Sequence, residues 1–321
     1  MSETKLSQAA LQSLRQDDSD SLHRFVASSE SFQVLDSVPP KVSSRGPGLG
    51  PQTLYVLDSS FNPPTNAHFN IARSALSRHA ADLSSVGLLL LLATQNADKP
   101  AKPAMFEDRL VMMHLFARDL RAALLTAATT AIATPDGGDR AADPNNNNNN
   151  DNNADNDNVP APLSIDVGVT KLPYFIDKAA AIAAANIYPE GLEQIHLTGF
   201  DTLIRIFDPK YYPPQHTLEP LSPFLSQHRL RVTLRPDDDW GGREEQELFL
   251  RDLSQGALEK VGGRREWAQR IEFIEGKKEG EKPISSTKAR NAVQNDVQEL
   301  DYLVTPSIRD WMVSQNLYKE S

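Results

Sequence analysis

The residues best suited to chemistry lie in one stretch, residues 59–68, which reads SSFNPPTNAH. The apolar run 54–57 comes directly before it, and apolar residues at helical spacing follow it. This order predicts a buried strand, a loop stiffened by two prolines, and a helix that begins near Thr65 or Asn66. Because such a helix aims free backbone N–H groups past the carboxyl edge of a sheet, the stretch predicts an anion site, most often for phosphate. His68, in the first helical turn, could reach the same anion.

A second candidate for anion binding is residues 283–290, which read PISSTKAR and follow the last predicted strand. Ser285 or Ser286 can cap a helix here and leave backbone N–H groups free. Ser286 and Arg290 are four residues apart, so a helix places them on one face. A hydroxyl, free amides and a guanidinium together suit a polyphosphate. Taken alone, the segment also fits an ordinary helix cap with a surface arginine.

Together the two stretches resemble the nucleotidyltransferase family. Residues 59–68 are similar to its signature, usually G-[ST]-F-x-P-x-[HT]-x-G-H, and the double proline is typical of the branch that makes NAD from nicotinamide mononucleotide and ATP. Residues 283–290 resemble the family's I-S-S-T-x-x-R motif, in the expected order along the chain. Two positions depart from the pattern, since Ser59 and Ala67 stand where the family usually has glycine, but both residues are small. The resemblance covers most of residues 54–318.

The resemblance implies roles for individual residues. His68 would contact the α-phosphate of ATP, and Lys102 would add positive charge from a loop in which Lys99 is a rival. The residues implied in ATP and phosphate binding are Ser60, Phe61, Thr65, His68, Lys102, Ser285, Ser286, Thr287 and Arg290, with His68, Lys102 and Arg290 as the catalytic group. Those implied in mononucleotide binding are Ser60, Phe61, Tyr174, Phe175, Asp177, Gly199, Asp201 and Arg235. Trp240 is a further aromatic residue that could stack on a base.

Ordinary structural roles compete with several of these assignments. Lys99 and Lys102 fit solvated loop charges equally well, and Tyr174 and Phe175 fit core residues. The acidic run 237–239 favours an exposed turn over a metal site. No residue is therefore assigned to a metal, and Mg²⁺ would be held mainly by substrate phosphates.

The function we expect is adenylyl transfer from ATP to nicotinamide mononucleotide, giving NAD and pyrophosphate by in-line attack without a covalent intermediate. This chemistry needs positioning and charge neutralisation, which Mg²⁺ would assist, more than it needs a protein nucleophile. Two alternatives stay open. One is a sister nucleotidyltransferase or ATP hydrolase with a different acceptor, which the departures at Ser59 and Ala67 and the Tyr- and Pro-rich residues 208–223 keep open. The other is a nucleotide-binding regulatory protein without turnover. The choice between nicotinamide and nicotinic acid acceptors is also open.

Predicted strands and helices alternate along the chain, which indicates an α/β fold with a doubly wound parallel sheet. The family resemblance implies the Rossmann-like nucleotidyltransferase version of this fold. Residues 1–50 are interpreted as a helical extension and linker, and residues 51–321 as the nucleotidyltransferase domain. Residues 135–162 form an Asn-rich insertion with few apolar side chains, so we expect it to be disordered.

Composition narrows the class of protein further. The 321 residues carry a formal net charge of −10, which argues against a nucleic-acid partner, and they include no Cys, which excludes disulfides and thiolate metal sites. No segment approaches the roughly 20 apolar residues of a membrane span. These features favour a cytoplasmic protein, with the nucleus as a second compartment, whose partners are small-molecule nucleotides. The oligomeric state is left open.

Overall fold

The computed structural model describes residues 6–39, 50–94, 104–132, 163–236, 240–276 and 281–319. The predictions for Lys99, Lys102, the Asn-rich insertion and residues 237–239 lie outside the described residues. Most of the linker that was predicted before residue 51 lies outside them as well.

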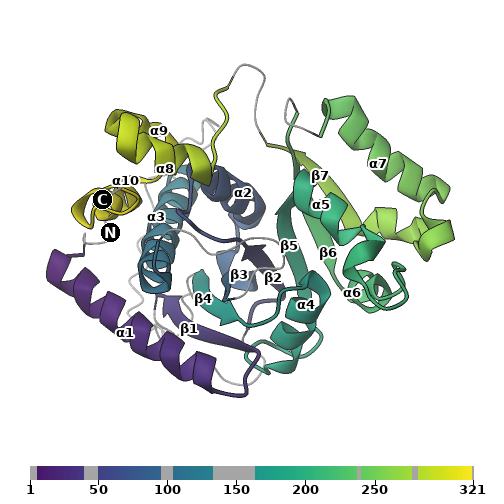
Figure 1. Cartoon of the computed structure of the whole chain (residues 1–321), viewed down its shortest axis with the longest axis horizontal. Helices are drawn as coiled ribbons and strands as arrows, with labels where there is room; N and C mark the ends of the chain where they lie inside the picture. The colour runs from purple at the N-terminus through teal and green to yellow at the C-terminus, as the bar shows by residue number, and fades with distance from the viewer. Residues whose placement is uncertain are drawn as a thin grey trace, which may run out of the picture.

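A seven-stranded sheet with the order β1-β4-β3-β2-β5-β6-β7 forms the centre of the molecule (Figure 1). Its strands are β1 Phe32–Val38, β2 Thr53–Asp58, β3 Val86–Ala93, β4 Ser164–Thr170, β5 Glu193–Gly199, β6 Arg229–Leu234 and β7 Ile271–Glu275. Each pairing in this sheet is parallel except that of β1 with β4. The strand order reverses at β2, because β3 and β4 follow on one side of it and β5 returns to the other. Ligands bind at such a switch point, outside the carboxyl ends of the strands.

Helices cover both faces of the sheet. They are α1 Gln8–Ala27, α2 Asn66–Leu76, α3 Phe106–Ile132, α4 Phe175–Ala184, α5 Phe200–Ile206, α6 Leu221–Gln227, α7 Arg243–Gln255, α8 Ser286–Asn295, α9 Leu300–Leu303 and α10 Pro306–Ser314. Tyr55 and Leu57 of β2 belong to a core cluster with α2 and α3, whereas Leu54 and Val56 belong to a cluster that includes Ile182 of α4. Two covered faces explain why β3 and the middle of β2 are continuous apolar runs. The predicted doubly wound α/β fold is confirmed.

The strand β1 was not predicted from the sequence. It pairs antiparallel with β4, and α1 before it packs on α3. Between these elements lies the buried His114 of α3, 3.2 Å from a carboxylate oxygen of Asp18 and 3.5 Å from one of Asp36. The strand carries polar residues and shifts register between Val34 and Asp36, which hides the alternation by which strands are recognised. Strand β1 therefore adds an edge to the sheet, which was predicted to begin after residue 50. Helix α1 before it packs on the same part of the molecule.

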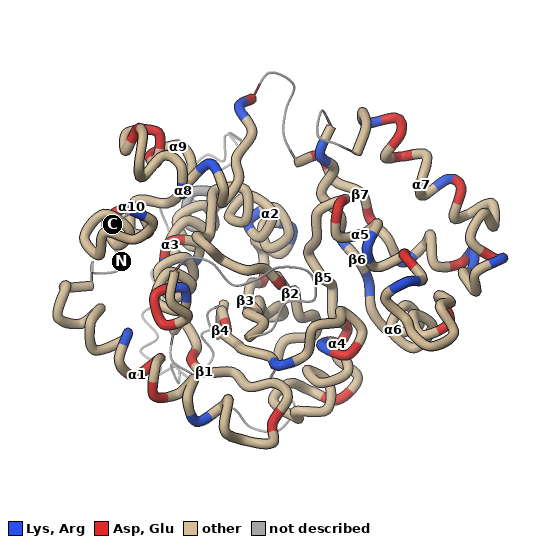
Figure 2. Tube along the Cα trace, in the orientation of Figure 1, with Lys and Arg blue, Asp and Glu red and all other residues tan. Residues whose placement is uncertain are grey.

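Charged residues are spread over the outer helices. Figure 2 shows acidic and basic residues interspersed along α7, where Arg243 Nε lies 2.7 Å from Glu247 Oε1 one turn further on. Such mixing is typical of a solvated surface. Within the described ranges, no helix combines the length and the apolar character needed to cross a membrane.

Candidate active site

The loop between β2 and α2 holds His68 in one orientation. The backbone N–H of Thr65 donates to Nδ1 of His68 at 3.0 Å, and Thr65 Oγ1 lies 2.8 Å from the same nitrogen. Because a backbone N–H can only donate, Nδ1 is an acceptor, and the proton of the neutral imidazole sits on Nε2. Nε2 lies 2.9 Å from Ser59 Oγ. The helix begins at Asn66, as predicted, and His68 takes the place of the Glu or Gln in an ordinary capping box.

His68 is held in its neutral form. Burial, with a smaller contribution from the positive charge of Arg235, lowers the pKa of His68 to about 4. At neutral pH the imidazole is therefore an uncharged N–H donor. It can exchange the Ser59 hydroxyl for a phosphate oxygen without changing its protonation state.

A buried arginine fixes the start of the loop. Arg109 of α3 donates from Nε and Nη2 to the carbonyl oxygen of Ser60, at 2.8 and 2.5 Å, and its guanidinium lies 4.6 Å from the centre of the Phe106 ring. Burial lowers the pKa of Arg109 to about 10, so it stays charged at neutral pH. The next residue, Phe61, is fully buried with φ of 44°, a left-handed conformation that is uncommon outside glycine. Its ring lies 5.6 Å from that of His68.

The second motif closes onto the first. Ser285, one of the two caps considered from the sequence, accepts a hydrogen bond from the first turn of α8, so the helix begins at Ser286. The Ser286 hydroxyl donates to the carbonyl oxygen of Pro63 at 2.8 Å. Arg290 donates from Nη1 to the carbonyl oxygen of Asn62 at 2.8 Å. The first turn of α8 is therefore bonded to the loop that precedes α2, which places the N-termini of both helices at the predicted anion site.

A second contact to Asn62 comes from Tyr318, near the end of the described residues. The Tyr318 hydroxyl donates to Asn62 Oδ1 at 2.8 Å. Burial raises the pKa of Tyr318, so the phenol keeps the proton that this bond requires. Arg290 also donates to Thr287 Oγ1 at 3.1 Å. The side chain and the carbonyl of Asn62 are thus fixed by two different segments.

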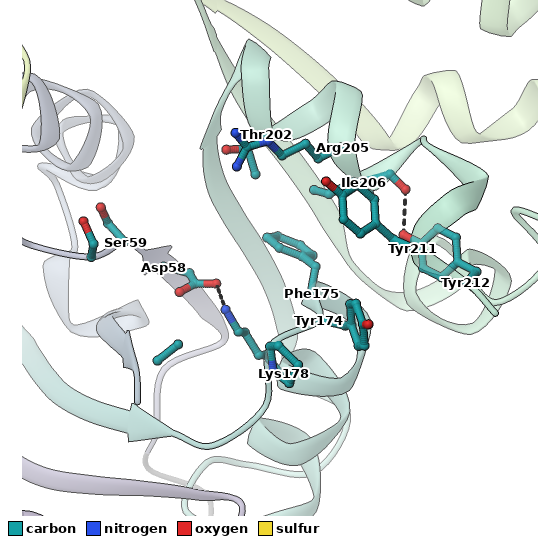
Figure 3. Close-up of a pocket in the computed structure, with 13 residues that line it drawn as sticks. Asp58, Ser59, Tyr174, Phe175, Lys178, Thr202, Arg205, Ile206, Tyr211 and Tyr212 are labelled. Atoms are coloured by element: carbon teal, nitrogen blue, oxygen red, sulfur yellow. Dashed lines mark hydrogen bonds and ion pairs between the residues drawn. The ribbon is translucent and has the colours of Figure 1, made fainter. Parts of the chain in front are cut away.

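A cavity of about 300 Å³ opens beside the loop (Figure 3). It is lined by Asp58, Ser59, Ser60, Ala93, Pro173, Tyr174, Phe175, Lys178, Thr202, Arg205, Ile206, Tyr211 and Tyr212. Its aromatic residues come from two segments, the start of α4 and the short turn 209–212. The cavity therefore joins the loop of residues 59–65, which we call the phosphate loop after its predicted ligand, to a wall of aromatic rings. This combination suits a nucleotide with a flat base.

Tyr174 and Phe175, which the resemblance implied in mononucleotide binding, line this cavity. The centre of the Phe175 ring is 4.6 Å from that of His196 and 5.6 Å from that of Phe224, so packing against these two rings fixes its position. Tyr174 is 37% exposed and lies at the rim. One fixed ring and one accessible ring can together bracket a base.

Gly199, Asp201 and Arg235 also come together, at the carboxyl ends of β5 and β6. Arg235 Nη1 lies 3.7 Å from Asp201 Oδ1. A Cβ atom on Gly199 would come within 2.6 Å of Asp201 Oδ1 and 3.2 Å of Arg235 Nε, so a larger residue here would displace these two side chains. Gln246 of α7 accepts from the backbone N–H of Arg235 at 3.0 Å and donates to its carbonyl oxygen at 2.8 Å. The backbone beneath the guanidinium is therefore fixed.

Of the described residues implied in mononucleotide binding, Asp177 and Trp240 neither line the cavity nor join the cluster of Gly199, Asp201 and Arg235. Asp177 is exposed on α4, because neighbouring residues on a helix point about 100° apart and Lys178 faces inward. Trp240 is 38% exposed in the loop between β6 and α7. Lys102 lies outside the described residues.

The residues of the site that sequence reasoning missed include Arg109, Lys178 and Tyr318. Lys178 is buried and its Nζ lies 2.5 Å from Asp58 Oδ2. Its position offered one usable signal, since it is a lone basic residue in the first turn of an Ala-rich helix that directly follows a strand. Arg109 and Tyr318 act on the loop through contacts with residues far away in the sequence, which no local pattern reveals.

Fold and site together define a class of protein: a Rossmann-like α/β protein whose predicted anion site lies between two helix N-termini, at the point where the strand order reverses. No protein-family model matches the chain. It is 29% identical over 285 residues to the "Putative nicotinamide mononucleotide adenylyltransferase" of Schizosaccharomyces pombe, and the match covers 89% of this chain and 90% of that protein. This match confirms the resemblance that the two motifs indicated.

Two solved structures are also similar to the chain. Both are nicotinic acid mononucleotide adenylyltransferase from Plasmodium falciparum, one complexed with NaAD and one with APC. Each is 12% identical and covers 83% of this chain. The match to the NaAD complex covers 97% of that chain with a TM-score of 0.45. The match to the APC complex covers 96% of that chain with a TM-score of 0.41.

Proposed function

We propose that this chain transfers the adenylyl group of ATP to nicotinamide mononucleotide, giving NAD and pyrophosphate. The observation that carries the proposal is the neutral His68, whose Nε2–H lies at the anion site where two helix N-termini meet. The similarity to the S. pombe protein over most of the chain supports the choice of acceptor. The aromatic cavity beside the loop offers a place for the pyridine ring.

In this mechanism the 5′-phosphate of the mononucleotide lies in the cavity beside Ser60 and attacks the α-phosphorus of ATP in line. A phosphorus–oxygen bond to the α-phosphate forms while the bond to the β-phosphate breaks, and pyrophosphate leaves with the electron pair. The attacking phosphate is already an anion, so no general base is needed. The His68 N–H donates to the α-phosphate and stabilises the charge that develops there.

The first turn of α8 would bind the β- and γ-phosphates of ATP. Its amides, the Thr287 hydroxyl and the Arg290 guanidinium form a cationic edge beside the loop. In the described part of the chain, no group of three or more His, Cys, Asp or Glu side chains could hold a metal ion. Our proposal is that Mg²⁺ is held mainly by the phosphates of the substrates, where it would supply charge neutralisation for the departing pyrophosphate.

The test is to incubate the purified protein with ATP and nicotinamide mononucleotide and to measure NAD and pyrophosphate in the same samples. We expect equal amounts of the two products. Parallel samples contain nicotinic acid mononucleotide or no acceptor. Breakdown of ATP without an adenylylated acceptor would identify an ATP hydrolase, and ATP binding without any turnover would identify a regulatory protein.

A further inference from the structure

The ion pair between Asp58 and Lys178 is used by no step of the proposed mechanism. Asp58 is the last residue of β2, directly before the phosphate loop, and Lys178 lies in the first turn of α4. Lys178 Nζ is 2.5 Å from Asp58 Oδ2, with the two side chains 9% and 16% exposed. Figure 3 shows the pair inside the cavity, between Ser59 and Phe175.

A carboxylate is an unexpected neighbour for a site that must accept two anionic phosphates. Lys178 cancels that charge, but burying both ions is costly, and an apolar pair of similar size often stabilises a protein equally well. Stability therefore does not explain why ions occupy this position. What distinguishes the pair is the two elements that it joins.

The pair connects the two sides of the cavity. On one side, Asp58 leads into Ser59 and Ser60 of the phosphate loop. On the other, Lys178 lies one turn after the aromatic residues Tyr174 and Phe175. Gln194 of β5 donates to the carbonyl oxygen of Ala179 at 3.0 Å, which fixes the adjacent part of α4 to the sheet. The ion pair then ties the cavity-facing side of the helix to β2.

We infer that Asp58 and Lys178 are a positioning pair for the acceptor nucleotide. The pair sets the aromatic wall against the phosphate loop, so that the mononucleotide can place its ring beside Phe175 and its phosphate beside Ser60 at the same time. ATP, bound through α8 on the far side of the loop, does not depend on this separation. The inference rests on the proposed function, because it assigns the cavity to the mononucleotide.

The experiment compares Asp58→Asn, Lys178→Met and the double variant by measuring KM for each substrate. We expect each single variant to raise KM for the mononucleotide about tenfold, the loss of one charged hydrogen bond, and to change KM for ATP less than about twofold. The double variant should show the same tenfold increase, because all three variants break one bridge.

Lys178→Arg should keep the affinity within about threefold. Arg229→Met, which breaks an exposed pair with Glu193 at the amino ends of β5 and β6, is the matched control and should leave both KM values unchanged.

Each other outcome overturns the inference. Recovery of the wild-type KM in the double variant would show that Lys178 only neutralises Asp58. A much larger loss in Lys178→Met than in Asp58→Asn would show direct contact between Lys178 and the nucleotide. Equal losses for both substrates would show a general structural role. If a buried unpaired charge prevents a single variant from folding, the double variant, which leaves no unpaired charge, still gives the KM values that test the inference. Absence of NAD formation by the wild-type protein would instead overturn the proposed function, and with it the assignment of the cavity.

Discussion

The phosphate loop and the cavity that we propose for the acceptor nucleotide lie side by side but are built differently. Three loop residues, Ser60, Asn62 and Pro63, have carbonyl groups or side chains held by side chains from α3, α8 and the segment after α10. The cavity wall is made of aromatic rings from two segments, with one buried ion pair beneath them. A loop fixed in this way can stabilise charge without reorganising during the reaction. The cavity provides surface and shape, so changes there should affect binding more than turnover.

The largest effect should come from His68→Ala on the loop side. If the imidazole donates to the α-phosphate mainly in the transition state, kcat should fall on the order of 100- to 1000-fold while ATP affinity changes little. The measurements are kcat for NAD formation and ATP binding by calorimetry. His23→Ala, an exposed position on α1, serves as the control. An unchanged kcat in a folded variant would remove His68 from the mechanism.

Arg290→Ala should have the next largest effect. It removes a phosphate ligand and also the donor to the Asn62 carbonyl, so ATP affinity should fall about 10- to 100-fold. Mononucleotide affinity should fall much less, and titrations with each ligand alone compare the two. Lys288→Ala on the exposed side of the same helix is the matched control. Equal losses for both ligands would contradict the division of the site into loop and cavity.

Tyr318→Phe tests how much the distant contact contributes to the loop. The variant loses only the hydroxyl that donates to Asn62, a bond worth about 1 kcal/mol. We expect kcat/KM to fall about fivefold, with a small decrease in the melting temperature. If kcat/KM is unchanged while the melting temperature falls, the bond stabilises the fold without ordering the loop.

The smallest effect concerns pH. The pKa of His68 is lowered to about 4 by burial, so its neutral form persists and kcat should show no histidine titration between pH 6 and 8. The unfolded chain binds a proton near pH 6.5, whereas the folded chain does so only near pH 4. Stability should therefore decrease as pH falls from 6.5 towards 4 and be independent of His68 above that window. NMR of the labelled imidazole, assigned with His68→Gln, gives both the pKa and the Nε2–H tautomer. A midpoint near 6.5 would contradict the structure.

The loop was predictable from sequence because its signals are local. The run of small residues and prolines before His68, and the serines that cap α8, are each contiguous in the chain, and the helix starts follow from them. Strands buried on both faces were also recognisable as apolar runs. The residues that hold these parts together were not predictable. Arg109 is one charge on a long helix, and Lys178 resembles a solvated lysine until β2 is placed beside it. Strand β1 was hidden by its polar residues and its register shift.

The closure of the loop by Arg290 and Tyr318 has a consequence for how the protein is made. These residues follow Asn62 by 228 and 256 positions. A ribosome adds about 5–20 residues each second, so the partners of the loop emerge on the order of tens of seconds after the loop itself. Throughout that interval the nascent chain carries His68 on a loop that lacks two of its fixed contacts. Activity is therefore expected to begin only when the last helices have been synthesised and have folded against the sheet, and unfinished chains should not consume ATP.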